Sequence, residues 1–169
     1  MTYTKLLRSS WLSLNLVCAF TLASKKSEEK TVIVVGEGGS GKTSLIHSLI
    51  GKTDTEAKPT VGMEFNFGRK TVDSKKEIAN YYEVAGGKDS AKMLWIPFHK
   101  KGTRFENTVF VVVCDLARPG NVLPDLDFWL KQIRETERAV FEQVQTENPA
   151  RATAIESWSN QTWNDHEDA

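Results

Sequence analysis

The sequence predicts an α/β fold with a mainly parallel sheet flanked by helices. Two short apolar runs, at 31–35 and 108–114, have the β-branched pattern of buried strands. Segments with helical spacing follow each run, and this alternation is typical of strands that lie parallel in one sheet. The composition, with 40% hydrophobic and 26% charged residues in a chain of 169, is that of a globular protein.

The first half of the chain predicts a strand, a helix and two further strands. The run TVIVV at 31–35 leads into a glycine-rich turn, and apolar residues then recur at helical spacing over 44–51. Residues 52–60 are polar and include a proline, which indicates a loop. Alternation over 63–67 and the run over 76–84 predict two strands.

The second half predicts one strand and two helices. The run TVFVVVC at 108–114 is the strongest candidate for a buried strand. Residues 124–145 place apolar side chains on one helical face, and 150–158 suggest a shorter helix. The face of the longer helix is formed by Leu126, Trp129, Leu130, Ile133, Val140, Phe141 and Val144.

Charge and cysteine content exclude several classes of protein. The 22 basic and 22 acidic residues give a net charge of zero, which argues against electrostatic binding of nucleic acid by the whole chain. Cys18 and Cys114 are too few for a disulfide framework or a zinc site. The three histidines show no metal-ligand spacing.

The segment GEGGSGKT at 36–43 satisfies G-x-x-x-x-G-K-[ST], the signature of a phosphate-binding P-loop. Glycines let backbone N–H groups point inward, and the following helix adds the positive end of its dipole. Lys42 is expected to reach the β- and γ-phosphates, and Thr43 to ligate Mg²⁺. The predicted nucleotide-binding residues of the loop are Gly36, Gly38, Gly39, Ser40, Gly41, Lys42 and Thr43.

This motif predicts a P-loop NTPase domain that holds GTP or ATP with Mg²⁺, and the spacings described next favour the small-GTPase type. A loop of this kind can also hold nucleotide without turnover, or persist only as an inherited fold. Both alternatives stay open at this point.

Three further positions extend the predicted site. Thr60 stands at the spacing of the switch threonine of small GTPases, which contacts Mg²⁺ and the γ-phosphate. Glu83-Val84-Ala85-Gly86 falls where these proteins carry D-x-x-G. We therefore expect Thr43, Thr60 and Glu83 around Mg²⁺, and the Gly86 amide on the γ-phosphate. The alternative for Thr60 is a residue that only ends a loop.

Two residues bear on turnover. Gly87 stands where many GTPases have a glutamine that orients the attacking water, so we predict slow or absent hydrolysis and no catalytic residue. Asp115 ends the strand at 108–114 in the Walker-B pattern of ATPases. The alternative for Asp115 is a carboxylate that caps the following turn.

We predict domain boundaries at residues 30 and 145. Residues 1–30 form a leader or extension outside the fold, and their apolar stretch at 11–23 resembles a secretory signal. Dependence on cytosolic nucleotide argues against secretion. Residues 31–145 form the P-loop domain. Residues 146–169 form an acidic, partly helical tail.

From Val32 to about His166 the sequence resembles the light intermediate chains of cytoplasmic dynein, most closely the dynein-2 type. The segments that carry the resemblance are GEGGSGKTSLI, KPTVGMEFNFGRK, KEIANYYEVAGG, FVVVCDLARPGNVLPDL and WNDHED. The KPT…EFNFGR run and the acid-x-x-Gly-Gly step distinguish the chain from ordinary Rab-like GTPases.

The resemblance implies a Ras-like fold that acts as a non-catalytic scaffold for the dynein heavy chain and other dynein-2 subunits. It implies a role in retrograde intraflagellar transport and cilium assembly. The implied locations are the cytoplasm, the cytoskeleton, and the basal body and axoneme of the cilium. Nucleic acid and direct membrane contact are not expected.

Family members continue into another apolar strand with a base-reading N/S-K-x-D-type motif, which this sequence does not contain. We therefore expect a C-terminally incomplete domain in which the strand at 108–114 lies at a sheet edge. A Rab-like switch GTPase and a P-loop ATPase that uses Asp115 remain alternative functions.

Overall fold

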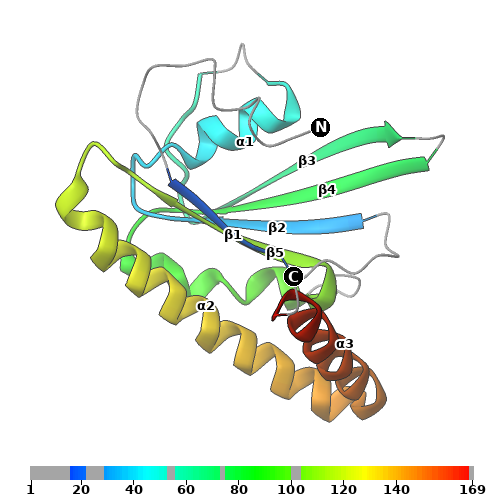
Figure 1. The fold of residues 1–169 in the computed structure, drawn as a ribbon. Coiled ribbons are helices and arrows are strands. Elements are labelled where there is room, and N and C mark those ends of the chain that lie inside the picture. The colour runs from blue at the N-terminus through cyan, green and yellow to red at the C-terminus, as the bar shows by residue number, and fades with distance from the viewer. Residues whose placement is uncertain (1–15, 22–28, 53–55, 73–74, 100–103, 168–169) are drawn as a thin grey trace.

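The computed structural model describes residues 16–21, 29–52, 56–72, 75–99 and 104–167 (Figure 1). Within these residues five strands form one sheet in the order β1-β5-β2-β4-β3. Helix α1 covers one face of the sheet, and helix α2 runs across the other. The predicted α/β class is confirmed.

The sheet is mixed rather than mainly parallel. The central strand β2 (Glu29–Val35) runs parallel to β4 (Lys75–Val84) and to β5 (Thr108–Cys114). Strand β3 (Met63–Val72) pairs antiparallel with β4, with Met63 opposite Val84 and Val72 opposite Lys75. Strand β1 (Leu16–Thr21) pairs antiparallel with β5.

The position of β1 corrects two predictions. The sequence places residues 1–30 outside the fold, but Leu16–Thr21 pairs with β5 from Cys114 to Val109. Strand β5 therefore has a neighbour on each side and does not lie at an edge. Without β1, the apolar strand β5 would expose a row of unpaired backbone N–H and C=O groups along one edge. Residues 1–15 and 22–28 of the predicted extension lie outside the described residues.

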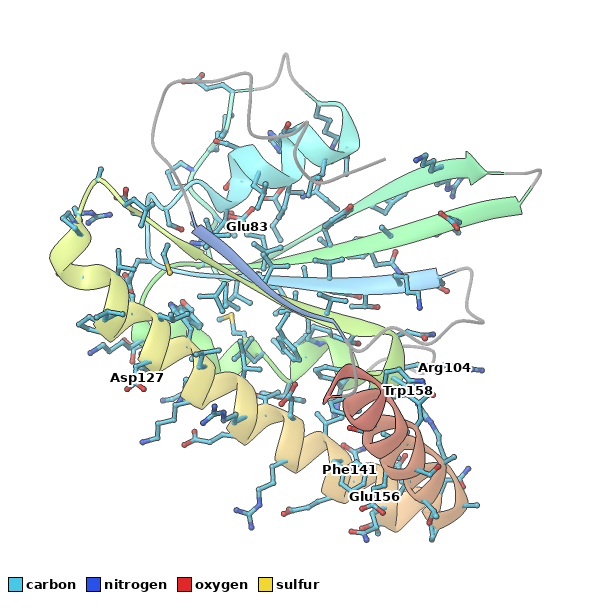
Figure 2. The ribbon with its side chains drawn as sticks, viewed as in Figure 1. Glu83, Arg104, Asp127, Phe141, Glu156 and Trp158 are labelled. Carbon is cyan, nitrogen blue, oxygen red and sulfur yellow. The ribbon has the colours of Figure 1, made fainter. Side chains whose placement is uncertain are left out.

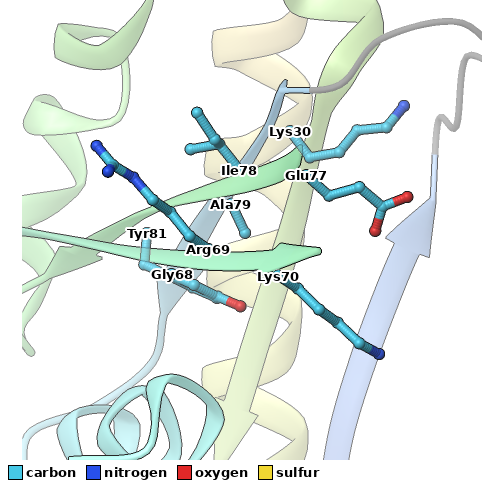
Figure 3. Close-up of a pocket in the computed structure, with 8 residues that line it drawn as sticks. All are labelled: Lys30, Gly68, Arg69, Lys70, Glu77, Ile78, Ala79 and Tyr81. Carbon is cyan, nitrogen blue, oxygen red and sulfur yellow. The ribbon is translucent and has the colours of Figure 1, made fainter. Parts of the chain in front are cut away.

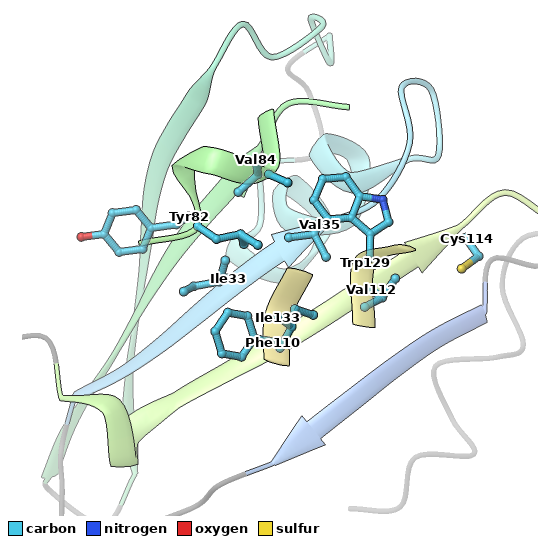
Figure 4. Close-up of a cluster of buried hydrophobic side chains, with 11 residues drawn as sticks. Ile33, Val35, Tyr82, Val84, Phe110, Val112, Cys114, Trp129 and Ile133 are labelled. Carbon is cyan, nitrogen blue, oxygen red and sulfur yellow. The ribbon is translucent and has the colours of Figure 1, made fainter. Parts of the chain in front are cut away.

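Each face of the sheet buries its own cluster of apolar side chains. On one face, Val34 of β2 packs with Ile46 of α1 (Lys42–Ile50). Ile33 and Val35 point to the opposite face, because consecutive residues of a strand alternate in direction. Figure 4 shows this second cluster, whose labelled members are Ile33, Val35, Tyr82, Val84, Phe110, Val112, Cys114, Trp129 and Ile133.

Helix α2 (Pro119–Glu147) begins earlier than the predicted helix at 124–145. Pro119 occupies the first helical turn, where its missing N–H costs no hydrogen bond. Pro124, the predicted start, lies inside the helix. The helix buries Trp129, Ile133 and Val140, which confirms three members of the predicted face. Trp129 and Ile133 belong to the cluster on the sheet.

The predicted acidic tail is a helix over most of its length. Helix α3 (Pro149–Glu167) extends well beyond the predicted segment at 150–158 and lies beside the end of α2 (Figure 1). Arg151 of α3 pairs with Glu106 at 2.8 Å between Nη2 and Oε2, and this pair joins the helix to the start of β5. The division predicted at residue 145 falls inside α2, which ends at Glu147.

Short 3₁₀ turns connect β4 to β5. They are η2 (Lys88–Met93), η3 (Ile96–His99) and η4 (Phe105–Asn107). Their buried residues include Ala91 and Phe105. Among the helices in the described part of the chain, none has the length and apolar character needed to cross a bilayer.

Candidate functional site

The P-loop connects β2 to α1 in a conformation that requires glycine. Gly36, Gly39 and Gly41 have φ angles of 144°, 78° and 91°, which side-chain-bearing residues rarely adopt. A Cβ added to Gly36 would lie 2.2 Å from the Val113 carbonyl oxygen of β5. The loop therefore turns tightly against the neighbouring strand.

The N-terminus of α1 is open toward this loop. Its N-cap residue, Gly41, offers no side-chain hydrogen bond, and the first turn contains no acidic residue. The first N–H groups of a helix have no partner within the helix, and they carry the positive end of its dipole. This end of α1 therefore suits an anion, as the motif predicts.

Lys42 folds back over the loop. Its side chain is buried, and its Nζ donates to the carbonyl oxygens of Gly36 and Glu37, each at 2.8 Å. Burial lowers the pKa of Lys42, while the carboxylates of Glu83 and Glu37 act in the opposite direction. The ammonium group is thus held inside the curve of the loop.

Thr43 and Glu83 meet although they are 40 residues apart. The Thr43 hydroxyl donates to Glu83 Oε1 at 2.7 Å, and Glu83 is 2% exposed. Glu83 is the penultimate residue of β4 and lies close to α1 (Figure 2). Its side chain, one methylene longer than aspartate, reaches the threonine directly. A hydroxyl that donates its proton to Glu83 keeps lone pairs for a metal ion.

Gly86 lies directly against the P-loop. A Cβ added to it would stand 2.1 Å from the Gly38 nitrogen, so only glycine permits this contact between the two backbones. At Gly87, with a φ of 104°, a Cβ would meet nothing within 4 Å. Gly87 has no side chain that could position a water molecule.

Thr60 is close to the same end of the sheet, but no hydrogen bond in the described residues joins it to Thr43 or Glu83. Its hydroxyl is buried without a partner. Nearby, the Gly62 carbonyl accepts a hydrogen bond from the Ala85 N–H at 2.7 Å, which ties this segment to the end of β4. The geometry thus assembles Thr43 and Glu83 and leaves Thr60 adjacent.

Asp115 caps the turn after β5. Its Oδ1 accepts a hydrogen bond from the Ala117 N–H at 2.9 Å, and its Oδ2 accepts one from Arg118 Nε at 3.0 Å. The same two hydrogen bonds lower the pKa of Asp115. Thr43 bonds to Glu83 and not to Asp115, so the geometry favours the capping interpretation over a Walker-B role.

Arg118 is a site residue that the sequence analysis missed. Its Nη2 donates to the Gly38 carbonyl at 3.2 Å, across 80 positions of the chain. The sequence offers no periodic or motif signal for this contact. It arises because β2 and β5 are parallel neighbours, so their carboxyl ends meet at one edge of the sheet.

Buried polar atoms at the loop are consistent with a bound group. Ser40 Oγ, Thr60 Oγ1 and Glu83 Oε2 are buried and have no hydrogen-bond partner. Buried polar atoms are normally satisfied, so each of these atoms fits contact with a ligand or with water. Together with the open helix terminus, they fit a nucleotide phosphate with Mg²⁺. The described residues contain no cluster of three or more His, Cys, Asp or Glu side chains that could hold a metal ion alone.

A separate open hollow of about 340 Å³ lies at the opposite end of the sheet (Figure 3). Its basic residues do not converge, since Arg69 and Lys70 point away from each other. The residues that line it are Lys30, Gly68, Arg69, Lys70, Glu77, Ile78, Ala79 and Tyr81.

Comparison with known proteins gives matches along most of the chain. A family model described as dynein light intermediate chain (DLIC) matches residues 7–167. Cytoplasmic dynein 2 light intermediate chain 1 of Rattus norvegicus is 33% identical over 101 residues, covering 59% of this chain and 28% of the relative.

Two further relatives match the chain over different lengths. Cytoplasmic dynein 2 light intermediate chain 1 of Mus musculus is 27% identical over 143 residues, covering 83% of this chain and 40% of the relative. GTP-binding protein YPTC5 of Chlamydomonas reinhardtii is 36% identical over 66 residues, covering 38% of this chain and 32% of the relative. The chain spans less than half the length of these curated relatives.

Proposed function

The chain belongs to the dynein light intermediate chain family, and we propose that it serves as a light intermediate chain subunit of the cytoplasmic dynein-2 motor. The match over residues 7–167 carries this proposal, because it includes every described strand and helix. The two dynein-2 relatives favour that motor. Retrograde intraflagellar transport and cilium assembly are the corresponding proposed roles.

In this proposal the domain is a scaffold rather than an enzyme. Its partners are the dynein heavy chain and other dynein-2 subunits, and it acts in the cytoplasm, at the cytoskeleton, and in the basal body and axoneme of the cilium. Gly87 supports the non-catalytic part, because no side chain there can orient a water molecule for attack on a phosphate.

We propose that the P-loop holds a nucleoside polyphosphate with Mg²⁺. The backbone N–H groups at the start of α1 and the Lys42 ammonium would hold the phosphates, and Thr43, oriented by Glu83, would hold the metal. Thr60 and Gly86 would contact the terminal phosphate. When bound, Mg²⁺ neutralises part of the phosphate charge.

Association with the motor can be tested by immunoprecipitation from ciliated cells. The tagged 169-residue chain is the bait, and a small GTPase of similar size carries the same tag as the control. Quantitative mass spectrometry should show the dynein-2 heavy chain enriched over both the control and the dynein-1 heavy chain. Equal recovery with both baits would refute the proposal.

A Rab-like switch GTPase is the second candidate. The Thr43–Glu83 hydrogen bond and the contact of Gly86 with the loop favour it, because they bring the switch-like segment onto the phosphate site. GTP turnover by the purified chain, compared with Lys42→Ala, separates the two candidates. Turnover well above that of the variant would favour the switch, and turnover equal to it would favour the scaffold.

A further inference from the structure

Arg118 places a guanidinium group at the mouth of the P-loop. It stands at the N-cap of α2, directly after the turn that follows β5. Besides the 3.2 Å hydrogen bond to the Gly38 carbonyl, its Nη2 lies 3.9 Å from the position that a Cβ on Gly39 would occupy. The guanidinium therefore borders the two glycines that form the outer part of the loop.

Asp115 holds this side chain in position. The ion pair between Arg118 Nε and Asp115 Oδ2 is 3.0 Å long, and Asp115 is itself fixed by the N–H of Ala117. An arginine side chain loses much rotamer freedom when it is fixed. Here the turn holds it before a ligand arrives, although 55% of the Arg118 side chain is exposed.

The arrangement leaves donors of Arg118 available to a ligand. A guanidinium carries five N–H donors in a planar fork, and the contacts of Arg118 with Asp115 and Gly38 use donors on Nε and Nη2. The planar fork matches the oxygens of a phosphate, which it can bind with two parallel hydrogen bonds.

Gly86 identifies which part of a nucleotide Arg118 would meet. Gly86, two residues after the end of β4, and Arg118, after β5, both contact Gly38. In the proposed nucleotide site, Gly86 contacts the terminal phosphate. Strands β4 and β5 lie on either side of β2, which leads into the loop. A side chain that contacts the same glycine from the other side of β2 is placed to contact the same phosphate.

The charges around the loop give this arginine a further role. Asp125 has its pKa raised first by burial and then by the nearby carboxylate of Glu37, whereas Arg118 and Lys88 lower it. Two carboxylates near the loop would repel a polyphosphate. The Arg118 guanidinium, which lies beside these carboxylates, offsets their repulsion of the terminal phosphate.

We propose that Arg118 is a phosphate ligand of this site and binds the terminal phosphate of a nucleoside triphosphate, with Asp115 holding it in place. This inference rests on the proposed binding of a nucleotide by the P-loop. The ligand class is the triphosphate, in preference to the diphosphate, whichever base it carries.

The test compares the wild-type 169-residue chain with Arg118→Ala, Arg118→Lys and Arg138→Ala. Arg138 is the matched control, because it lies on the same helix and pairs with Glu142 at the surface. Isothermal titration calorimetry with Mg²⁺ would measure binding of GDP, ADP and the non-hydrolysable triphosphate analogues of both. Thermal melting of each variant reports on folding.

We expect Arg118→Ala to weaken binding of the triphosphate analogue roughly tenfold and that of the diphosphate less than threefold, as for the loss of one charge-assisted contact. The affinity of Arg118→Lys for the triphosphate analogue should lie between those of the wild type and Arg118→Ala, because lysine keeps the charge but lacks the planar fork of donors. Arg138→Ala should bind as wild type does. If Arg118→Ala has a lower melting temperature than the wild type, the affinities of Arg118→Lys for the triphosphate analogue and the diphosphate test the proposal instead.

Equal losses for diphosphate and triphosphate, or no loss, would overturn the role of Arg118 while the proposed nucleotide site stands. A wild-type chain that binds none of the four nucleotides would instead overturn the nucleotide site, and this inference with it.

Discussion

The two ends of the sheet carry the same kinds of charged side chain in opposite settings. At the carboxyl ends of β2 and β4, Lys42 and Glu83 are 5% and 2% exposed, and both are hydrogen-bonded. At the other end, Lys70 and Glu77 line an open hollow and are exposed to solvent. The carboxyl ends of parallel strands are where open α/β sheets bind ligands.

This difference shows what turns charged residues into a binding site. Exposed charges are hydrated and screened, so they bind an anion weakly wherever they stand. Lys42 and Glu83 have already lost their water and are oriented by the protein, so a ligand meets prearranged partners. Matched substitutions at the two ends test this comparison.

The largest effect is expected for Gly36→Ala. The new methyl group would lie 2.2 Å from the Val113 carbonyl oxygen, at a φ of 144°, so the free energy of unfolding should fall by about 3 kcal/mol or more. At Gly68, beside the hollow, an added Cβ would approach only side chains, Ile50 at 3.3 Å and Tyr81 at 3.6 Å, so Gly68→Ala should change the free energy of unfolding by less than about 1 kcal/mol. Urea unfolding followed by circular dichroism measures both.

Lys42→Ala should weaken nucleotide phosphate binding about a hundredfold, because a buried and oriented ammonium is lost. Lys70→Ala removes the same charge from the exposed end and should change affinity less than twofold. Titration with a fluorescent nucleotide measures the pair. Similar losses for both variants would mean that net charge, rather than the loop, governs binding.

Mg²⁺ should strengthen nucleotide binding roughly tenfold less in Glu83→Gln than in the wild type. The amide can still accept a hydrogen bond from Thr43 but carries no charge to stabilise a metal ion beside it. Glu77→Gln is the control at the hollow and should leave the dependence unchanged. Mg²⁺ titrations at a fixed nucleotide concentration compare them, and an unchanged Glu83→Gln would remove Glu83 from the metal site.

Arg151→Ala should produce the smallest effect, a loss of about 1 kcal/mol in stability, because its ion pair with Glu106 is partly exposed. Burial by itself would raise the pKa of Glu106, but Arg151 lowers it below its usual value. This carboxylate therefore stabilises the fold above about pH 4.5, and its contribution is lost as the pH falls further.

Melting temperatures at pH 7 and pH 4 should thus differ less for Arg151→Ala than for wild type, with nucleotide binding unchanged at pH 7. Arg138→Ala, whose pair with Glu142 is largely exposed, should retain the wild-type pH dependence. An altered nucleotide affinity in Arg151→Ala would show that the two ends of the sheet are coupled.

Most elements of the fold could be predicted from local pattern. The strands at β2 and β5 and the helix that buries Trp129 follow from short-range periodicity. The boundaries were less predictable, as the start of α2 at Pro119 and the length of α3 show. A proline is tolerated in several positions near a helix start, so it does not fix one residue.

The candidate site could also be predicted only in part. Residues 36–43 are contiguous, so their motif specifies the loop without knowledge of the fold. The pairing of Thr43 with Glu83 followed from family-like spacing, and the structure brings the two side chains together. The spacing of Thr60 predicts a metal contact, and this stays a prediction.

By itself, the sequence determined the P-loop, the α/β class and the resemblance to the dynein light intermediate chains, which the family match confirms. These features depend on residues close together in the chain. Only the tertiary structure decided that Leu16–Thr21 covers β5 and that Arg118 reaches Gly38. Both contacts join residues 80 or more positions apart, and they depend on which strands become neighbours, which no local pattern encodes.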